Sequence, residues 1–286
     1  GLFALGILVI VGNTIRLDQF AADTHIRGIW LQSAHATSGW SLDISGNTID
    51  KLINVDTGIT AIDLGGETYT DKHDSIWFNV YNNMICGFNF TSGSPVPNVY
   101  YRGIRYDGGS DFVVPIHFNC YYNSLYLPHF DNLSYTAGDE TSRRAAFAIG
   151  GPLSQSSRLM DIRNNIVRVE QYYAAAIHYM DYLDKTLFSS GFNDLSADTT
   201  SGAFTGRYSA FNSIIEYSTL EDWRNAPYSP DLTSVSLDPF AAVPPYTGIW
   251  TSPDNLLFTS YHSESLIGTP IGGITTDIKG VTRHPQ

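Results

Sequence analysis

The chain has 286 residues with a formal net charge of −12, 43% hydrophobic residues and only 15% charged residues. The hydrophobic fraction excludes wholesale disorder, and the negative charge argues against binding to nucleic acids or to anionic membrane surfaces. The 18 Tyr and 15 Phe, with abundant Gly, Asn, Ser and Thr, favour pleated strands joined by turns, so the composition indicates an all-β protein. Few lysines and many uncharged polar residues are typical of an extracellular location.

The chain opens with the apolar run GLFALGILVIVGNTI, residues 1–15. The run lacks the basic start and the small-residue cleavage site of a signal peptide, and it is too short to span a bilayer. We therefore expect a buried strand here, no membrane insertion, and a chain that is part of a longer protein.

A short pattern recurs along the chain: alternating apolar residues, then Asn, then any residue, then an aliphatic residue. The repeated asparagines, spaced by 34, 36, 40, 42 and 47 residues, are Asn13, Asn47, Asn83, Asn123, Asn165 and Asn212. A second pattern, a short alternating strand mostly flanked by glycine, occupies residues 27–31, 60–66, 102–109, 145–151 and 174–179. Each period therefore contains at least two strands and loops of variable length.

A period of 34 to 47 residues fits one turn of a solenoid. No period contains a long amphipathic helix, which disfavours strands joined by helices. Asparagines stacked at a bend can hydrogen-bond to the copies above and below them. A β-sandwich or propeller with Asn at its turns is the alternative, but it does not explain the aliphatic residue two positions after each Asn.

The arrangement G-I-x-L followed by I-x-x-N-x-I resembles the right-handed parallel β-helix repeat of secreted, pectate-lyase-like bacterial proteins. The tail is similar to the end of Bacteroidota-type surface-anchored proteins, in STLEDWRNA at 218–226, SLDPF at 236–240 and TTDIKGVTRHP at 275–285. It departs from them at 265–268, SLIG, where Ser-Pro-x-Ile-Asp is usual. The resemblance implies a right-handed parallel β-helix of about six or more coils over residues 1–217, with a C-terminal closing segment over 218–286.

Cysteine and metal chemistry are sparse in the sequence. Cys86 and Cys120 lie in strand-like runs and are expected to be buried thiols, with a disulfide between them as the alternative. The eight histidines lack zinc-ligand spacing, and no nucleophile elbow, P-loop or dinucleotide motif is present. We expect no cofactor; the acidic composition is compatible with calcium, but no pattern specifies a calcium or other metal site.

Residues 178–185, HYMDYLDK, form the densest cluster of candidate site residues. Strand alternation places Tyr179, Asp181 and Lys185 on one outer face, where they would contact a sugar. Asp181 and Lys185 are also candidate catalytic residues, because enzymes on the resembled scaffold use acidic residues with an Arg or Lys base. The competing interpretation is a loop flank with solvated charges.

Two further charged segments are candidates. Asp161 and Arg163 share one strand face as a possible acid and base, although a structural salt bridge is the simpler interpretation. The other segment comprises Arg102, Arg105, Asp107 and Asp111, beside Tyr100, Tyr101 and Tyr106. It either lines a groove with aromatic walls or, as we favour, ends a strand in a tight turn that leaves its charges in solvent.

Two classes of function fit these observations. We favour a non-catalytic extracellular surface module of a larger secreted protein, acting as a stalk, adhesin or glycan-binding part. Its expected partners are glycans and other domains or subunits of a surface assembly. The alternative is a polysaccharide lyase or glycoside hydrolase acting in a groove on the β-helix face. An Arg beside an acidic cluster in a cleft with aromatic walls would favour the enzyme, whereas a flat face of Tyr, Asn and Thr would favour binding.

Overall fold

The computed structural model describes residues 7–17, 25–31, 34–35, 41–54, 58–66, 68–69, 75–90, 99–108, 116–131, 144–150, 158–180, 188–210, 213–227, 231–236, 271–277 and 282. These residues are mostly β-strand, with one short α-helix, α1 (Leu220–Asn225), and one 3-10 turn (Thr199–Ser201). The all-β prediction is therefore confirmed. Within this part of the chain, no helix is long and apolar enough to cross a membrane.

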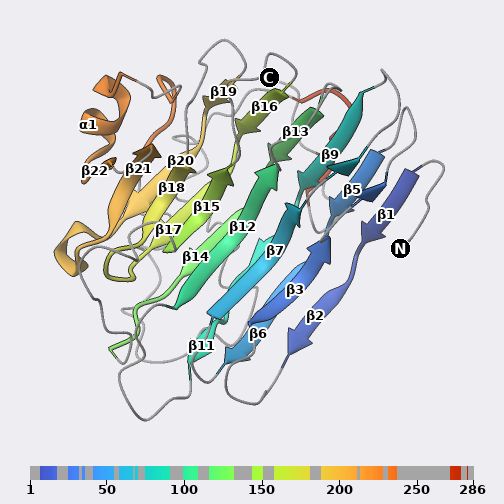
Figure 1. Ribbon diagram of the computed structural model, residues 1–286, viewed down its shortest axis with the longest axis horizontal. Helices are drawn as coiled ribbons and strands as arrows, with labels where there is room; N and C mark the ends of the chain where they lie inside the picture. Colours follow the sequence, from blue (N-terminus) through green and yellow to red (C-terminus); the bar gives the residue numbers. More distant parts are fainter. Residues whose placement is uncertain are drawn as a thin grey trace.

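Three sheets contain nearly all of the strands (Figure 1). Sheet I consists of β1 (Ile7–Val11), β5 (Ser41–Ser45), β9 (Ile76–Tyr81), β13 (Ile116–Tyr121), β16 (Arg158–Arg163) and β19 (Phe188–Gly191). Sheet II consists of β2 (Thr14–Leu17), β6 (Thr48–Asn54), β10 (Met84–Ile85), β11 (Asn89–Phe90), β14 (Ser124–Leu127), β17 (Ile166–Val169) and β20 (Asp194–Ala197). Sheet III consists of β3 (Ile26–Leu31), β7 (Gly58–Gly66), β12 (Tyr100–Gly108), β15 (Arg144–Gly150), β18 (Ala175–Met180), β21 (Phe204–Ala210) and β22 (Ser213–Tyr217). A small fourth sheet pairs β4 (Ala34–His35) with β8 (Thr68–Tyr69).

Each repeat of the chain adds one strand to each of the three sheets, except that β10 and β11 of one repeat both join sheet II. Thus β5, β6 and β7 are followed by β9, β10 and β12, and each new strand pairs in parallel with its counterpart in the preceding repeat. The described residues of all five segments of the second sequence pattern lie in or directly beside strands of sheet III, namely β3, β7, β12, β15 and β18. The register is regular, so equivalent residues of successive repeats lie side by side and form rows across the strands.

A column of stacked asparagines, here called the asparagine ladder, lies in the turn between sheets I and II. Its members are Asn13, Asn47, Asn83, Asn123, Asn165 and Asn193. At each step the backbone N–H and the side-chain Nδ2 donate to the next Oδ1, at 3.1 and 2.9 Å from Asn83 to Asn123. Nδ2 also donates to a strand carbonyl of the preceding repeat, as from Asn123 to Val80 O at 2.9 Å. These bonds satisfy polar groups that are fully buried from Asn47 onward.

The last position of the ladder differs from the sequence-based expectation. Asn193, which lies 28 residues after Asn165, occupies it, whereas Asn212 lies outside the described residues. The segment Asn193-Asp194-Leu195 carries the same Asn-x-aliphatic pattern in a shorter repeat. Ser234 then ends the column, because its Oγ accepts the backbone N–H of Asn193 at 3.1 Å.

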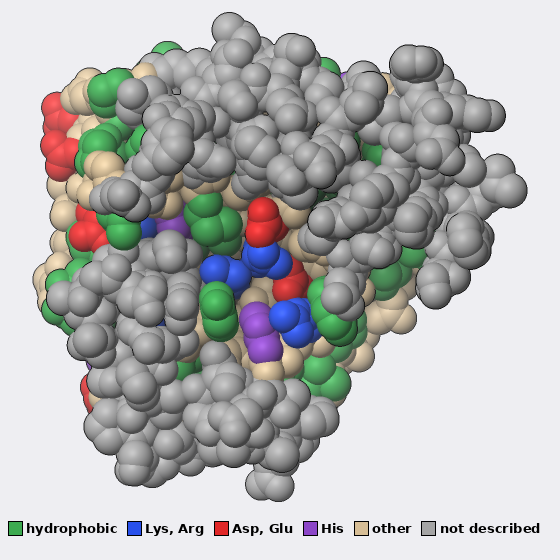
Figure 2. Space-filling view, viewed as in Figure 1, with side chains coloured by type: hydrophobic (Ala, Val, Ile, Leu, Met, Phe, Trp, Pro, Cys, Tyr) green, Lys and Arg blue, Asp and Glu red, His purple; other side chains and the backbone are tan. Residues whose placement is uncertain are grey.

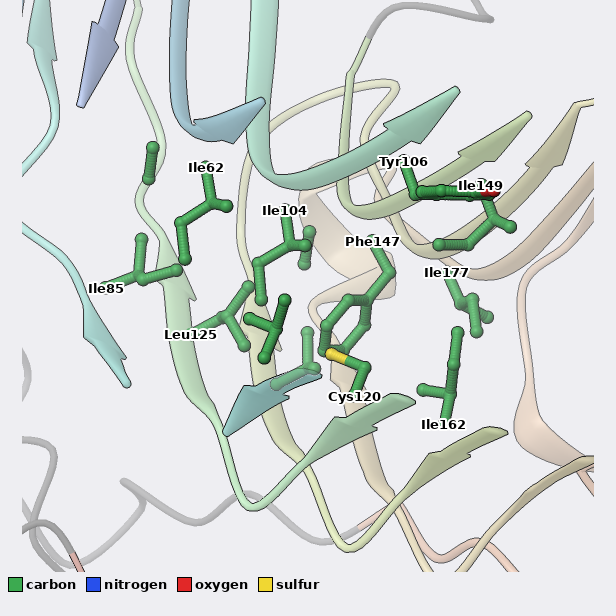
Figure 3. Packing of buried hydrophobic residues seen from close by; sticks show 14 of the residues in the cluster. Ile62, Ile85, Ile104, Tyr106, Cys120, Leu125, Phe147, Ile149, Ile162 and Ile177 are labelled. Carbon is green, nitrogen blue, oxygen red and sulfur yellow. The ribbon is translucent and has the colours of Figure 1, made fainter. Parts of the chain in front are cut away.

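The apolar core lies between the three sheets. The aliphatic residues two positions after the asparagines form one inner column of sheet II: Ile49, Ile85, Leu125, Val167 and Leu195, each 0% exposed. In Figure 3, Ile85 and Leu125 point toward Ile62 and Ile104 of sheet III, with Cys120 of sheet I nearby. This packing explains the aliphatic residue of the sequence pattern. Cys86 and Cys120 are buried free thiols, as predicted.

Sheet III bends at a line of small residues. In β12, Gly103 and Ile104 both face inward, since a Cβ at Gly103 would lie 2.4 Å from the Leu125 side chain and Ile104 is fully buried. Two successive inward residues interrupt the usual alternation of a strand. Arg102 and Arg105, three positions apart, therefore lie on the same outer face.

The described residues after β21 pack against the last strands of sheet III. Strand β22 pairs with β21 in the antiparallel direction. In α1, the fully buried Trp223 stacks on Tyr179 at 5.4 Å between ring centroids. Its indole fills the place of a side chain at Gly206, where a Cβ would lie 2.2 Å from the ring. Asp231 accepts the indole N–H at 2.9 Å and so fixes the ring over the last repeat.

Candidate functional site

The outer face of sheet III carries a cluster of charged and aromatic side chains, here called the arginine patch. It consists of His25, Arg27, Trp30, Asp63, Tyr100, Arg102, Arg105 and Asp107. Figure 2, which is viewed as Figure 1, shows basic, acidic and histidine side chains gathered near the centre of this face. The patch is built on β12, β7 and β3, with His25 directly before β3.

Asp63 joins two arginines of the patch. It is nearly fully buried, and its Oδ2 accepts from Arg27 Nε at 2.6 Å while its Oδ1 accepts from Arg105 Nη1 at 2.8 Å. The other terminal nitrogen of Arg105 donates to Asp107. Charges therefore alternate from Arg27 through Asp63 and Arg105 to Asp107, and the carboxylates hold the guanidiniums of Arg27 and Arg105 in fixed orientations.

Aromatic rings support the remaining guanidinium surfaces. The Arg27 Cζ lies 4.4 Å from the ring centroid of Trp30, and the Arg102 Cζ lies 4.8 Å from that of Tyr100. His25 stacks on Tyr100, with ring centroids 5.4 Å apart and ring planes 6° from parallel. Its Nε2 lies 2.9 Å from the Thr60 hydroxyl. Trp30 is 52% exposed, which leaves much of its ring open to a ligand.

The electrostatics of the patch differ from those of the whole chain. Burial, reinforced by Arg27, lowers the pKa of His25 to about 4, so the ring is neutral at pH 7. Burial also lowers the pKa of Arg102 to about 10, which still leaves it charged. Three guanidiniums against two carboxylates give a local excess of one positive charge in a chain whose formal net charge is −12.

The arrangement is suited to binding an anion rather than to hydrolysis. Burial alone would raise the pKa of Asp63, but the hydrogen bonds and positive charges of Arg105 and Arg27 outweigh it and hold the pKa below its ordinary value. An ionised carboxylate with both oxygens occupied is a poor general acid and a poor nucleophile. Arginine guanidiniums, in contrast, match the geometry of carboxylates and of sulfate or phosphate groups.

The sequence contained a signal for this patch. When the second-pattern segments of β3, β7 and β12 are aligned at their first small residue, Arg27, Thr60 and Arg102 occupy equivalent positions. In the same alignment, Trp30, Asp63 and Arg105 also occupy equivalent positions. Neighbouring repeats thus place opposite charges side by side. Strict alternation along residues 102–109 would place Arg102 and Arg105 on opposite faces of the strand. The bend at Gly103 brings them to the same face.

Strand β12 ends at Gly108, within the segment where its end was expected, and the residues that would form the turn after it lie outside the described residues. The charges of Arg102 and Arg105 are not left in solvent, however, since Arg102 is buried and Arg105 pairs with two carboxylates. Asp111 lies outside the described residues.

The cluster predicted at residues 178–185 is described only in part. Asp181 and Lys185 lie outside the described residues. Tyr179 faces inward and is fully buried between Phe188 and Trp223. Its ring therefore cannot stack on a sugar, contrary to the sequence-based expectation, because the alternation of β18 points this residue toward the core.

Asp161 and Arg163 lie together on the outer face of sheet I. Arg163 Nε donates to Asp161 Oδ1 at 2.6 Å, and the Tyr121 hydroxyl donates to Asp161 Oδ2 at 2.8 Å. The hydrogen bond and charge of Asp161 raise the pKa of Arg163, so the arginine is poorly placed to accept a proton. The pair belongs to a different face from the arginine patch.

No protein-family model, curated protein or solved structure matches this chain. Among the described residues, no group of three or more His, Cys, Asp or Glu side chains is arranged to hold a metal ion. The arginine patch is therefore interpreted from its own geometry.

Proposed function

We propose that the chain is a right-handed parallel β-helix. Three parallel sheets that gain one strand from each repeat support this architecture, as do the asparagine ladder and the aliphatic column inside it. The right-handed sense follows the strong preference of parallel crossover connections for that hand. The closing segment over 218–286 belongs to the same proposal, supported by the packing of Trp223 and Ser234 on the last repeat.

On this scaffold, we propose a non-catalytic surface module that binds an acidic glycan at the arginine patch. The observation that carries the proposal is the excess of positive charge on oriented guanidiniums beside an exposed Trp30, in a chain that is otherwise acidic. The guanidiniums would pair with carboxylate or sulfate groups of the glycan, and the indole would stack on a sugar ring.

The module is proposed to act at the cell surface, as a stalk or adhesin part of a larger secreted protein. Low charge density and abundant uncharged polar residues support the extracellular location. A solenoid also suits an assembly, because its flat sheets offer long faces to neighbouring domains or subunits.

The test is affinity electrophoresis of the purified chain through gels that contain polygalacturonate or alginate. We expect the chain to be retarded, and Arg27→Gln to weaken retardation about tenfold by removing one charge-assisted contact. Arg163→Gln is the matched control, because Arg27 and Arg163 side chains are equally exposed, at 27%, on different faces. Equal losses in both variants, or no retardation of the wild type, would contradict the assignment.

A polysaccharide lyase is the second candidate, and Arg102 is the observation that favours it. Burial lowers the pKa of its guanidinium to about 10, the direction that general-base catalysis requires. A lyase acting on an acidic polysaccharide releases products with a new carbon–carbon double bond, which absorb in the ultraviolet. Product that accumulates with the wild type and not with Arg102→Gln would replace the binding module with a lyase.

A further inference from the structure

The outer face of sheet I carries three parallel rows of side chains that cross the strands. The middle row is short and polar: Asp43, Asn79, Asn119 and Asp161. The first flanking row is Ser41, Trp77, His117 and Leu159. The second flanking row is Ser45, Tyr81, Tyr121 and Arg163. Larger side chains stand on both sides of the short middle row over β9, β13 and β16, and this arrangement of three rows is here called the trough.

Hydrogen bonds link the floor of the trough from Asp43 to Asn119, and the Tyr121 hydroxyl lies within hydrogen-bonding distance of both Asn119 and Asp161 at the last step. Asn79 Nδ2 donates to Asp43 Oδ1 at 2.6 Å, and Asn119 Nδ2 donates to Asn79 Oδ1 at 2.8 Å. These bonds hold each carboxamide in one orientation, so the floor presents the same polar edge in successive repeats. Neighbouring strands are about 4.8 Å apart, which gives the row a regular spacing.

The walls of the trough combine aromatic, aliphatic and polar side chains, and several of these side chains are partly exposed. Trp77 and His117 stack with their ring centroids 5.2 Å apart and their planes 12° from parallel. Leu159 extends this wall and is 43% exposed. On the other wall, the half-buried Tyr121 donates to Asp161 and lies under the Arg163 guanidinium, 5.6 Å from its Cζ.

The charge of the trough is opposite to that of the arginine patch. Two carboxylates, Asp43 and Asp161, face one guanidinium, Arg163. Burial lowers the pKa of His117, which is therefore neutral at pH 7. The trough thus has an excess of one negative charge, which disfavours uronate and sulfate groups.

We propose that this trough is a second binding site, which takes an uncharged polysaccharide chain running across the strands of sheet I. The sugar rings would make apolar contacts with the partly exposed side chains of Trp77, Tyr121 and Leu159, and their hydroxyls would hydrogen-bond to the floor amides and carboxylates. A ligand that is itself a regular polymer matches rows that repeat from strand to strand. The site is independent of the arginine patch, since the two share no residue.

The proposal is tested by affinity electrophoresis in gels that contain hydroxyethyl cellulose or galactomannan, with polygalacturonate gels run in parallel. We expect the wild type to be retarded in at least one neutral gel. Trp77→Ala is expected to lose about tenfold in affinity, because it removes the largest ring of the wall. Trp77→Phe keeps an aromatic platform and is expected to retain most of the binding.

Leu232→Ser is the matched control, since Leu232 is 70% exposed and lies outside sheet I. Thermal unfolding of every variant accompanies the gels. If Trp77→Ala does not fold, Tyr81→Ala on the opposite wall replaces it, with the same expected loss. Unretarded wild type in both neutral gels overturns the proposal, as does a folded wall variant that binds like the wild type. Retardation in polygalacturonate alone also overturns it and leaves the arginine patch as the single glycan site.

Discussion

The outer faces of sheets I and III are built on the same repeats but differ in how they use their side chains. Sheet I repeats similar residues from strand to strand, as in the row that contains Asn79 and Asn119. Sheet III instead concentrates opposite charges where Asp63 meets Arg27 and Arg105. The backbone of each repeat is fixed by the inner residues, so the outer positions are free to diverge into a regular surface or a local charged site.

If the inner residues hold the strands of both outer faces in place, removal of one asparagine of the ladder should destabilise the whole fold. We expect Asn123→Ala to lower the free energy of unfolding by about 3 kcal/mol, because several buried hydrogen-bonding groups lose their partner. Chemical denaturation measures the loss. Asn119→Ala, on the half-buried outer row of the same repeat, is the control and should cost about 1 kcal/mol or less. Equal losses would show that the ladder has no special role.

The two faces should also respond differently to removal of one carboxylate charge. We expect Asp63→Asn to lower the free energy of unfolding by about 2 kcal/mol, because two guanidiniums lose their shared partner. Asp161→Asn should cost less than about 1 kcal/mol, since Asp161 has one guanidinium partner and is more exposed.

Acid titration of unfolding sharpens this test. The pKa of Asp63 is lowered in the folded chain, so its contribution is present above the ordinary aspartate pKa of about 3.9 and is lost as pH falls through the lower folded value. The difference between the wild type and Asp63→Asn should therefore stay constant from about pH 5 to 8 and shrink below about pH 4. A constant difference at all pH values would contradict the ionised bridge.

A second pH-dependent effect is expected from His25. Because its pKa is about 4 in the folded chain against 6.5 ordinarily, the unfolded chain binds the additional proton between these values. The wild type should therefore lose stability as pH falls from 6.5 to 4, on top of any background slope. In His25→Gln this part of the slope should disappear, as measured by unfolding at matched pH values. An unchanged slope would mean that His25 is not held neutral beside Arg27.

Ionic strength should affect glycan binding at the two faces differently, and this test requires no substitution in the chain. Binding of polygalacturonate at the arginine patch should weaken as sodium chloride rises, because salt screens partly exposed charges. Binding of a neutral polysaccharide at sheet I should change little. Gels run at low and high salt provide the comparison, and parallel responses would contradict the charge difference between the faces.

The sequence predicted features that depend on local pattern. Asn47 and Ile49 are an example, because the turn, the ladder and the inner column each require a residue type at a fixed short spacing. Asn193 was missed because its repeat is shorter than the others. Tyr179 was placed outside because alternation alone does not say which face is inner. Pairs such as Arg27 and Asp63 follow only from aligning repeats in register.

The central claim is that the arginine patch binds an acidic glycan, and calorimetric titration with oligogalacturonate tests it most directly. The account predicts saturable binding that weakens about tenfold in Arg27→Gln and is unchanged in Arg163→Gln. No heat of binding with the folded wild type, or the same loss in both arginine variants, would contradict it.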